Sequence, residues 1–304
     1  MSRLLAILGA TATGKSSLAM EVAGATGAEI VSADALQVYR GLDIGTAKPS
    51  AEDRARVPHH LVDILDPAQR FSAGEFARRA LAAVAEIHGR GKAAIVAGGS
   101  GLYLRALFSG LAEIPAAPPE LRRELTARLR EEGAAGLRSE LEALDPETSR
   151  RLAPADVHRT VRALEVVRAT GRPLSSWLRD ARSSGTLPPC AKLGLTLPRA
   201  VLYDRIEERV HAMVERGWPE EVSGLLAAGI ATDAPALQAI GYSEWIRHLQ
   251  SDVDRETTIA AIVRATRRYA KRQETWFRRE RGVEWIDARE RARLVSEARV
   301  RLEG

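Results

Sequence analysis

Short apolar runs alternate with amphipathic segments along the first third of the chain. Leu4–Leu8 is an unbroken apolar run closed by Gly9, the pattern of a strand buried on both faces of a parallel sheet. A helix is predicted over 15–26, and the short runs Glu29–Ser32 and Ala93–Ala97 predict two further strands. Strands that alternate with helices in this order predict a parallel α/β sheet with crossover helices.

Polar and helix-capping residues organise the stretch between these strands. Residues 33–58 form a long polar loop, and a loop of this length inside a compact domain is usually functional. Ser72 followed by Glu75 reads as a capping box, which predicts a helix from there to about His88. Glycines gather again at Gly98–Gly101, directly after the third predicted strand.

The pattern changes at Ile114–Pro119, a proline-rich run that marks a boundary. From there to about Trp177 only helical periodicity appears. After a second loop-like stretch, Arg182–Pro189, a strand returns at Lys192–Leu197, and a long helix is predicted from about Arg255 to Glu280. A helical block between two α/β segments predicts an all-helical domain inserted into the sheet domain. The predicted domains are 1–114 with 189–304 for the α/β core, and 115–188 for the insertion.

The first predicted strand runs directly into a phosphate-loop motif. Gly9–Ser16 matches GxxxxGK[ST] between a strand and a helix, the context in which this motif binds an anion. Backbone amides and the helix N-terminus donate to the anion, Lys15 adds positive charge, and the Ser16 hydroxyl is placed to bind Mg²⁺. The expected fold class is therefore a P-loop NTPase-like α/β sheet. The residues expected to bind phosphate are Gly9, Thr11, Ala12, Thr13, Gly14, Lys15 and Ser16.

Composition narrows the setting of the protein. Hydrophobic residues make up 45% and charged residues 28%, ordinary values for a globular chain with a core. No apolar stretch approaches the ~20 residues of a membrane span, and the single cysteine, Cys190, excludes an internal disulfide. The opening residues lack the pattern of a signal peptide. We therefore expect a cytoplasmic protein without a membrane segment. A monomer is the expected oligomeric state.

Basic residues are concentrated in two places. The net charge of +5 is mild, but 150–182 holds eight arginines and 264–281 holds eight basic residues. Such stripes favour RNA as a partner, although any single arginine is as often part of a solvated helix face.

The phosphate loop alone leaves the class of protein open. A nucleotide kinase normally places an aspartate at the end of a second apolar strand to hold magnesium. The strand at 93–97 ends without an acid, and Asp63 is only a weak substitute. A small-molecule or nucleoside kinase is one alternative, and an RNA-binding phosphate-loop protein without turnover is another.

Further motifs, read in order along the chain, are more specific than the phosphate loop. Together they resemble the tRNA dimethylallyltransferases, also called isopentenyltransferases, of the bacterial type. The matching segments after the phosphate loop are Ser32–Tyr39, Gly41–Pro49, Gly98–Tyr103, Arg159–Glu165, Ile240–Tyr242 and Lys271–Arg278.

The resemblance implies a reaction and its substrates. The family moves a dimethylallyl group from dimethylallyl diphosphate to N6 of the adenosine immediately 3′ of the anticodon in certain tRNAs. The phosphate loop would then grip diphosphate as a leaving group, with Mg²⁺ as the cofactor and the anticodon stem-loop as the RNA partner. Arg205 resembles a family arginine expected to reach the diphosphate.

Asp34 is the expected general base. It follows the second strand at the ligand-binding edge of such a sheet, where a carboxylate can hold the amine in line and take its proton. A loop aspartate that only makes an Asx-turn is the structural alternative. Ser100 supplies a hydroxyl for catalysis or substrate binding where the family more often has threonine, and helix N-capping is its alternative role. Ala35 and Leu36 replace the serine and methionine common in the family.

The resemblance and the basic stripes together predict the RNA contacts. Phosphate contacts from arginine and lysine fix the register of a bound RNA, and the target base must leave its stack. Arg159 and Arg162 lie three apart and therefore share a helix face. The residues expected to contact tRNA are Asp34, Ala35, Leu36, Gln37, Ser100, Arg122, His158, Arg159, Arg162, Ile240, Gly241, Tyr242, Lys271, Arg272, Gln273 and Arg278.

Overall fold

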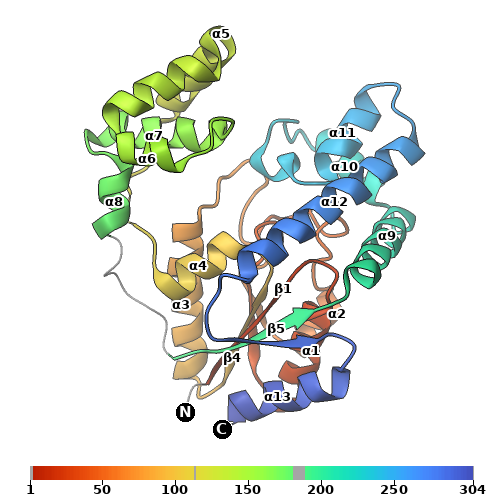
Figure 1. The fold of residues 1–304 in the computed structure, drawn as a ribbon. Helices are drawn as coiled ribbons and strands as arrows, with labels where there is room; N and C mark the ends of the chain where they lie inside the picture. Colours follow the sequence, from red (N-terminus) through yellow and green to blue (C-terminus); the bar gives the residue numbers. More distant parts are fainter. Residues whose placement is uncertain (1–2, 113, 181–188, 304) are drawn as a thin grey trace. The chain divides into compact units, whose positions relative to one another are not determined.

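The computed structural model describes residues 3–112, 114–180 and 189–303. Within these ranges six parallel strands form one sheet in the order β3-β2-β4-β1-β5-β6. The sheet confirms the predicted parallel α/β class, and Figure 1 shows how its helices surround it. The strands are β1 (Leu4–Gly9), β2 (Glu29–Ser32), β3 (His59–His60), β4 (Ala94–Gly98), β5 (Ala191–Thr196) and β6 (Val283–Asp287).

The register brings the carboxyl ends of three central strands together. Leu8 of β1 pairs with Gly98 of β4, and Ser32 of β2 pairs with Ala97. The segments that follow these strands therefore meet at one edge of the sheet, which is where α/β proteins bind ligands.

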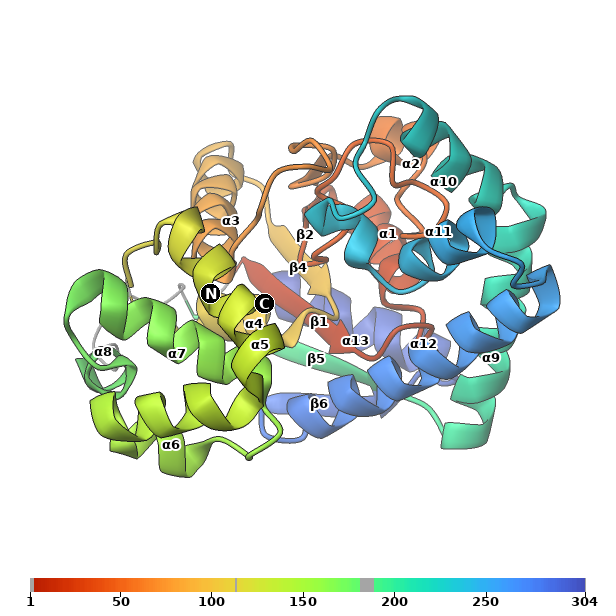
Figure 2. The ribbon, with the colours of Figure 1, turned by 90° about the horizontal axis from the view of Figure 1, so that it is seen from above.

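Alternate residues of β1 explain how the sheet is covered. Leu5 and Ile7 are fully buried in a cluster with Leu18 and Val22 of α1 (Lys15–Thr26) and Leu294 of α13 (Arg291–Glu303). Helices α1 and α13 lie side by side against the sheet (Figures 1 and 2).

A second hydrophobic cluster is formed by the loop after β2 and by four further helices, α9 (Arg199–Glu215), α10 (Trp218–Ala227), α11 (Tyr242–Gln250) and α12 (Arg255–Phe277). Its largest side chains, Trp218, Tyr242 and Trp245, are almost wholly buried and pack with Val38 and Leu42 of the loop after β2. Figure 2 shows α12 running alongside α9. The remaining helices of this unit are α2 (Ala51–Arg56), α3 (Ala73–Gly89) and α4 (Gly101–Ser109), with a 3₁₀ turn at Pro235–Gln238.

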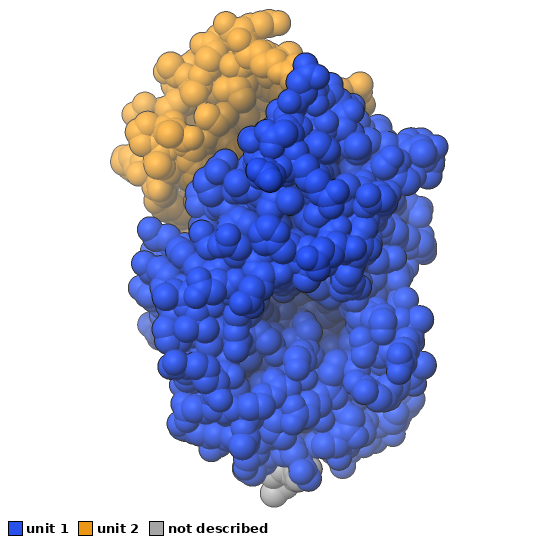
Figure 3. Space-filling view, turned by 90° about the vertical axis from the view of Figure 1, so that its right-hand side faces the viewer, with its two compact units in different colours: residues 1–108, 187–304 blue, residues 109–186 orange. Residues whose placement is uncertain are grey.

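The chain divides into two compact units, coloured separately in Figure 3. One combines Met1–Phe108 with Leu187–Gly304, and the other is Ser109–Thr186. The predicted insertion, 115–188, starts a few residues later and ends two residues later than this second unit. Its described helices are α5 (Pro119–Leu144), α6 (Pro146–Arg151), α7 (Val157–Thr170) and α8 (Leu174–Asp180), and Leu125, Leu137, Leu141 and Leu164 form the centre of its core.

Several local expectations differ from the structure. The polar loop 33–58 contains the short helix α2, which the sequence analysis missed together with β6 and α13. The Ser72 hydroxyl accepts the Glu75 amide at 3.1 Å, but the Glu75 carboxylate pairs with Arg79 and Arg78. Only half of the predicted capping box is therefore seen. The loop predicted at 182–189 falls almost wholly outside the described residues.

Across the described ranges, none of the helices combines the length and apolar character that a membrane crossing requires.

Candidate active site

The phosphate loop wraps from the end of β1 into the start of α1. Gly14 precedes the helix with φ 91°, a left-handed conformation that a side chain would strain. The Thr13 hydroxyl and the Lys15 ammonium both donate to the carbonyl of Ala10, at 2.8 and 2.5 Å, and thereby close the loop. The loop thus has the shape expected of an anion site.

Two cations face this loop. Desolvation is the main cause that lowers the pKa of Lys15 to about 7, and the nearby Arg209 guanidinium lowers it further. Arg209 comes from α9, lies 3.5 Å from the Thr11 hydroxyl and has its own pKa lowered by burial. The Asp34 carboxylate opposes both effects. Positive charge held out of water in this way favours a bound anion.

Arg209 was not predicted, whereas Arg205 was. The two residues are one turn apart on α9, but Arg209 lines the site and the charge of Arg205 acts instead on Asp287. The arginine that faces the phosphate loop is therefore Arg209. The sequence alone does not give the orientation of α9 about its axis, which decides whether Arg205 or Arg209 faces the phosphate loop.

Asp34 lies directly after β2. Its Oδ1 accepts the Leu36 amide at 2.9 Å, so the Asx-turn considered above is present. The Ala35 amide donates to the Ser100 hydroxyl at 3.1 Å, which joins this loop to the one after β4. The Ser100 carbonyl accepts the Leu104 amide at 3.1 Å, so Ser100 also precedes α4 in the N-cap position.

Two cavities meet at Asp34. One, about 190 Å³, is lined by the phosphate loop from Thr11 to Ser17, without Thr13, and by Gly98 and Gly99. The other, about 370 Å³, has walls of mixed polarity that include Met213, Ile240 and Arg272. A carboxylate thus lies between an anion pocket and a larger cavity. The residues shared by both are Thr11, Asp34, Thr46, Arg209 and Tyr269.

Tyr269 contributes a phenol to this shared wall. Burial raises its pKa to about 12, while hydrogen bonding with Ser100 and Gln273 acts in the opposite direction. The phenol therefore stays protonated at neutral pH.

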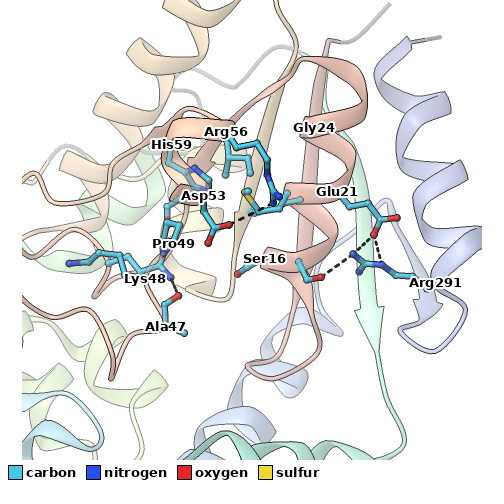
Figure 4. A pocket seen from close by; sticks show the side chains of 17 residues that line it. Ser16, Glu21, Gly24, Ala47, Lys48, Pro49, Asp53, Arg56, His59 and Arg291 are labelled. Carbon is cyan, nitrogen blue, oxygen red and sulfur yellow. Dashed lines mark hydrogen bonds and ion pairs between the residues drawn. The ribbon is translucent and has the colours of Figure 1, made fainter. Parts of the chain in front are cut away.

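A third cavity, about 690 Å³, lies on the other side of Ser16, Gln37 and Ala97, which also line the anion pocket. Figure 4 shows two charged pairs in its wall, Arg291 with Glu21 and Arg56 with Asp53. Arg291 pairs with Glu21 at 2.5 Å and also donates to the Ser17 hydroxyl. These groups satisfy one another within the wall.

Two of the residues expected to contact RNA, Gln37 and Tyr242, have buried side chains. Gln37 is 9% exposed; its Oε1 accepts from the Ser32 hydroxyl at 2.8 Å, and its Nε2 donates to the carbonyls of Thr46 and Ala47. Tyr242 is fully buried, and its hydroxyl donates to Glu221. These side chains hold the loop after β2 and the second cluster in place.

Other predicted RNA contacts lie on or directly after α12 and at the start of α11. Lys271 and Arg272 are exposed on α12, and Arg278 is exposed directly after its last residue. Gln273 is 6% exposed and bonds to Thr11 and Gly99. Gly241 precedes α11, with its backbone amide bonded to Glu244.

In the second unit, Arg122 and Arg162 are anchored to one buried acid. Both pair with Glu165, which is 1% exposed, and the Arg122 pair engages both carboxylate oxygens. These ion pairs hold the pKa of Glu165 below its usual range. His158 and Arg159 are both exposed, Arg159 at 76% of its side chain. Arg159 pairs with Asp156, the residue that caps the start of α7. His158 and Arg159 are therefore the most accessible of the predicted contacts in this unit.

Glu221 and Lys48 were missed by the sequence analysis. The Glu221 carboxylate accepts the amides of Asp43, Ile44 and Gly45, at 2.9, 2.6 and 3.3 Å, in addition to the Tyr242 hydroxyl. Lys48 is buried and pairs with two aspartates, at 43 and 63. The available sequence signals were the position of Lys48 in the motif Gly41–Pro49 and that of Glu221 in a region predicted to be helical.

The acids available for a metal are few. The described ranges hold no group of three or more His, Cys, Asp or Glu side chains that could bind a metal ion. Asp63, the substitute considered for a kinase, has its two oxygens on Lys48 and Arg54. The exposed Ser16 hydroxyl lines the anion pocket, which fits Mg²⁺ because this ion takes one or two protein ligands together with phosphate oxygens and water.

A phosphate loop on a parallel sheet, with a carboxylate between its anion pocket and a second cavity, defines a P-loop-like α/β protein with two adjoining cavities at the edge of its sheet. A family model described as IPP transferase matches residues 37–280. The chain belongs to this family, and the resemblance drawn from its motifs is confirmed. The kinase alternative loses its support with this assignment.

Relatives and solved structures agree with the family model. The tRNA dimethylallyltransferase of Geobacter metallireducens is 48% identical over 286 residues, 94% of this chain and 93% of the relative. That of Halorhodospira halophila is 49% identical over 277 residues, 90% and 89% of the two chains. The tRNA isopentenylpyrophosphate transferase of Bacillus halodurans has a TM-score of 0.70 at 38% identity, covering 100% of this chain and 97% of the other. A eukaryotic dimethylallyltransferase acting on tRNA has a TM-score of 0.80 at 27% identity, covering 95% and 74%.

Proposed function

We propose that this protein transfers the dimethylallyl group of dimethylallyl diphosphate to N6 of the adenosine immediately 3′ of the anticodon in tRNA. The products are the N6-isopentenyladenosine in the RNA and free diphosphate. The observation that carries the proposal is the position of Asp34 in the wall of both the anion pocket and the larger cavity. The family of the chain supports the same reaction.

The leaving group is served by the phosphate loop. The bond between the allylic carbon and the diphosphate oxygen breaks, and its electron pair leaves with the oxygen. Amides of the loop, Lys15 and Arg209 stabilise the charge that develops there. Mg²⁺, held by the Ser16 hydroxyl and the diphosphate, would supply further charge neutralisation.

The nucleophile is served by Asp34. The N6 lone pair is delocalised into the purine ring, so the amine needs a partner that takes its proton as the new C–N bond forms. The Asp34 carboxylate accepts that proton, and the amide of Leu36 holds the carboxylate in place. The Tyr269 phenol and the Ser100 hydroxyl offer further hydrogen bonds to the base in the 370 Å³ cavity.

The RNA is held by basic side chains. Four exposed residues are suited to phosphate contacts: Lys271 and Arg272 of α12, Arg278 directly after it, and Arg159 of α7. Arg272 also lines the larger cavity, so one side chain of α12 reaches the edge of the base site.

The experiment supplies all three components at once. The purified protein is incubated with Mg²⁺, dimethylallyl diphosphate and an unmodified anticodon stem-loop with three adenosines after the anticodon. The mass of the RNA is then measured by mass spectrometry. We expect the mass of one C5H8 unit to be added to the first of these adenosines. A matched stem-loop with guanosine at that position lacks the N6 amine and should gain nothing. ATP-dependent phosphorylation without prenylation would overturn the proposal.

A further inference from the structure

Gln273 bridges the phosphate loop and the glycine-rich segment after β4. Its Oε1 accepts the backbone amide of Thr11 at 2.8 Å, and its Nε2 donates to the carbonyl of Gly99 at 2.8 Å. The side chain is 6% exposed and lines the anion pocket. Both ends of the amide are therefore paired with backbone groups of the two loops that form this pocket.

The fit of this bridge is tight. A Cβ at Gly99 would clash with the Nε2 of Gln273 and would lie 3.4 Å from the Gly9 carbonyl. The Thr11 amide requires an acceptor and the Gly99 carbonyl requires a donor, and a side-chain amide offers one of each. A glutamate would present two acceptors, and a methionine would present neither group.

The direction of Gln273 separates it from its neighbours on α12. Lys271 and Arg272 are exposed, whereas Gln273 points into the protein together with Tyr269, one turn earlier. A buried amide that bonds to backbone groups through both its oxygen and its nitrogen has little capacity left for an RNA phosphate. The resemblance and the basic stripe around it predict an RNA contact for Gln273, but neither indicates the direction of its side chain.

We propose that Gln273 is a positioning residue for the diphosphate, acting through Thr11 and Gly99, and that it does not contact the RNA. It holds the phosphate loop at Thr11 at a fixed distance from Gly99 in the segment after β4. The amides and cations of the pocket then meet the diphosphate without rearrangement, which is the basis of preorganised charge stabilisation. This role rests on the proposed function for its ligand, the diphosphate of the allylic donor.

The test compares two substitutions with opposite chemistry. Gln273→Met keeps the length of the side chain but leaves the Thr11 amide and the Gly99 carbonyl without their partner. Gln273→Glu retains an acceptor for Thr11 and adds negative charge beside the diphosphate. We expect both to weaken the binding of inorganic diphosphate, measured by calorimetry, by about tenfold, the size typical of unpairing a buried hydrogen-bonding group. The KM for dimethylallyl diphosphate should rise equally, with the affinity for the RNA stem-loop unchanged.

A neighbouring substitution gives the matched control. Lys271→Gln, two residues away on the same helix, should weaken stem-loop binding and leave diphosphate binding as in the parent. Gly99→Ala approaches the bridge from the other side, and its added Cβ should reproduce the loss of diphosphate affinity if a Gln273 variant fails to fold. A folded Gln273→Met protein that binds diphosphate normally, or that loses RNA affinity by the same factor, would overturn the positioning role.

This test does not depend on turnover. If the parent protein adds no prenyl group to RNA, the proposed function fails. Binding of inorganic diphosphate still reports whether Gln273 shapes the loop.

Discussion

Raising the pH above 7 should weaken diphosphate binding because Lys15 must carry its proton to bind the anion. In the free protein, desolvation and the charge of Arg209 lower the pKa of Lys15 to about 7. A diphosphate beside the ammonium favours the charged form and raises this pKa again. Binding therefore takes up a proton at every pH between the two values.

The size of the effect follows from the pKa of the free protein. At pH 7 about half of the Lys15 side chains are protonated, and at pH 9 about one in a hundred is. The affinity for diphosphate should consequently fall by about fiftyfold between pH 7 and pH 9. At pH 8 the binding of each ligand should take up about 0.9 proton at this residue.

Calorimetry in buffers of different ionisation enthalpy measures both quantities. Inorganic diphosphate also titrates, so its own protons must be subtracted. Lys15→Arg serves this purpose because a guanidinium stays charged over the whole range. Equal pH dependence and equal proton uptake in Lys15→Arg and the parent would refute the role assigned to Lys15.

The same pKa predicts the opposite trend for the stability of the free protein. A lysine in the unfolded chain titrates near 10.5, so between about pH 7 and 10.5 the unfolded state binds more protons than the folded state. The contribution of Lys15 to stability therefore rises with pH across this window and is lowest below pH 7. Lys15→Met should raise the Tm of the free protein at pH 7 and abolish the increase in Tm that diphosphate causes. A lower Tm in Lys15→Met would contradict this account of its burial.

Three further substitutions test separate parts of the structure. Glu221→Gln removes a carboxylate that binds three loop amides, so it should lower the free energy of unfolding in urea by roughly 1–3 kcal/mol. It should also raise the KM for RNA more than the KM for the allylic donor. A free energy of unfolding equal to that of the parent would show that Glu221 does not stabilise the loop. Arg159→Gln should reduce the salt dependence of stem-loop binding, with the slope of log K against log salt concentration falling by about 0.7–0.9. An unchanged slope would remove Arg159 from the RNA surface. Arg122→Ala leaves the buried Glu165 carboxylate with Arg162 alone and should cost about 2 kcal/mol in the same unfolding assay, a value below that of a fully buried pair because Arg122 is partly exposed.

Local patterns were sufficient to predict the centre of the fold. The apolar run that became β1 is fully buried, so its hydrophobicity left no other placement, and its observed bounds differ by one residue from the expectation. The phosphate loop was predictable because its backbone shape and one of its two cations, Lys15, are encoded within eight consecutive residues. The motifs after β2 and β4 also pointed to the correct edge of the sheet.

Features that depend on packing could not be predicted in the same way. β6, Val283–Asp287, includes the charged or half-exposed residues Glu284 and Trp285, so it lacks the apolar run that marks the inner strands. Gln37 and Gln273 are polar, and their sequence gives no sign that burial would direct them inward. The choice between Arg205 and Arg209 depends on how α9 is rotated against the sheet, which four residues of spacing cannot reveal.

The central claim is that the Asp34 carboxylate, which lines both the anion pocket and the larger cavity, takes the proton of the RNA base as diphosphate leaves. Asp34→Asn keeps the size of the side chain and the acceptor for the Leu36 amide but cannot take a proton. In a single-turnover reaction with dimethylallyl diphosphate, Mg²⁺ and the stem-loop, the parent should release one diphosphate for each C5H8 unit gained by the RNA. Asp34→Asn should bind both substrates and lose at least about a hundredfold in rate, the lower range of general-base catalysis. Turnover in Asp34→Asn equal to that of the parent, or diphosphate release without RNA gain in the parent, would contradict the account.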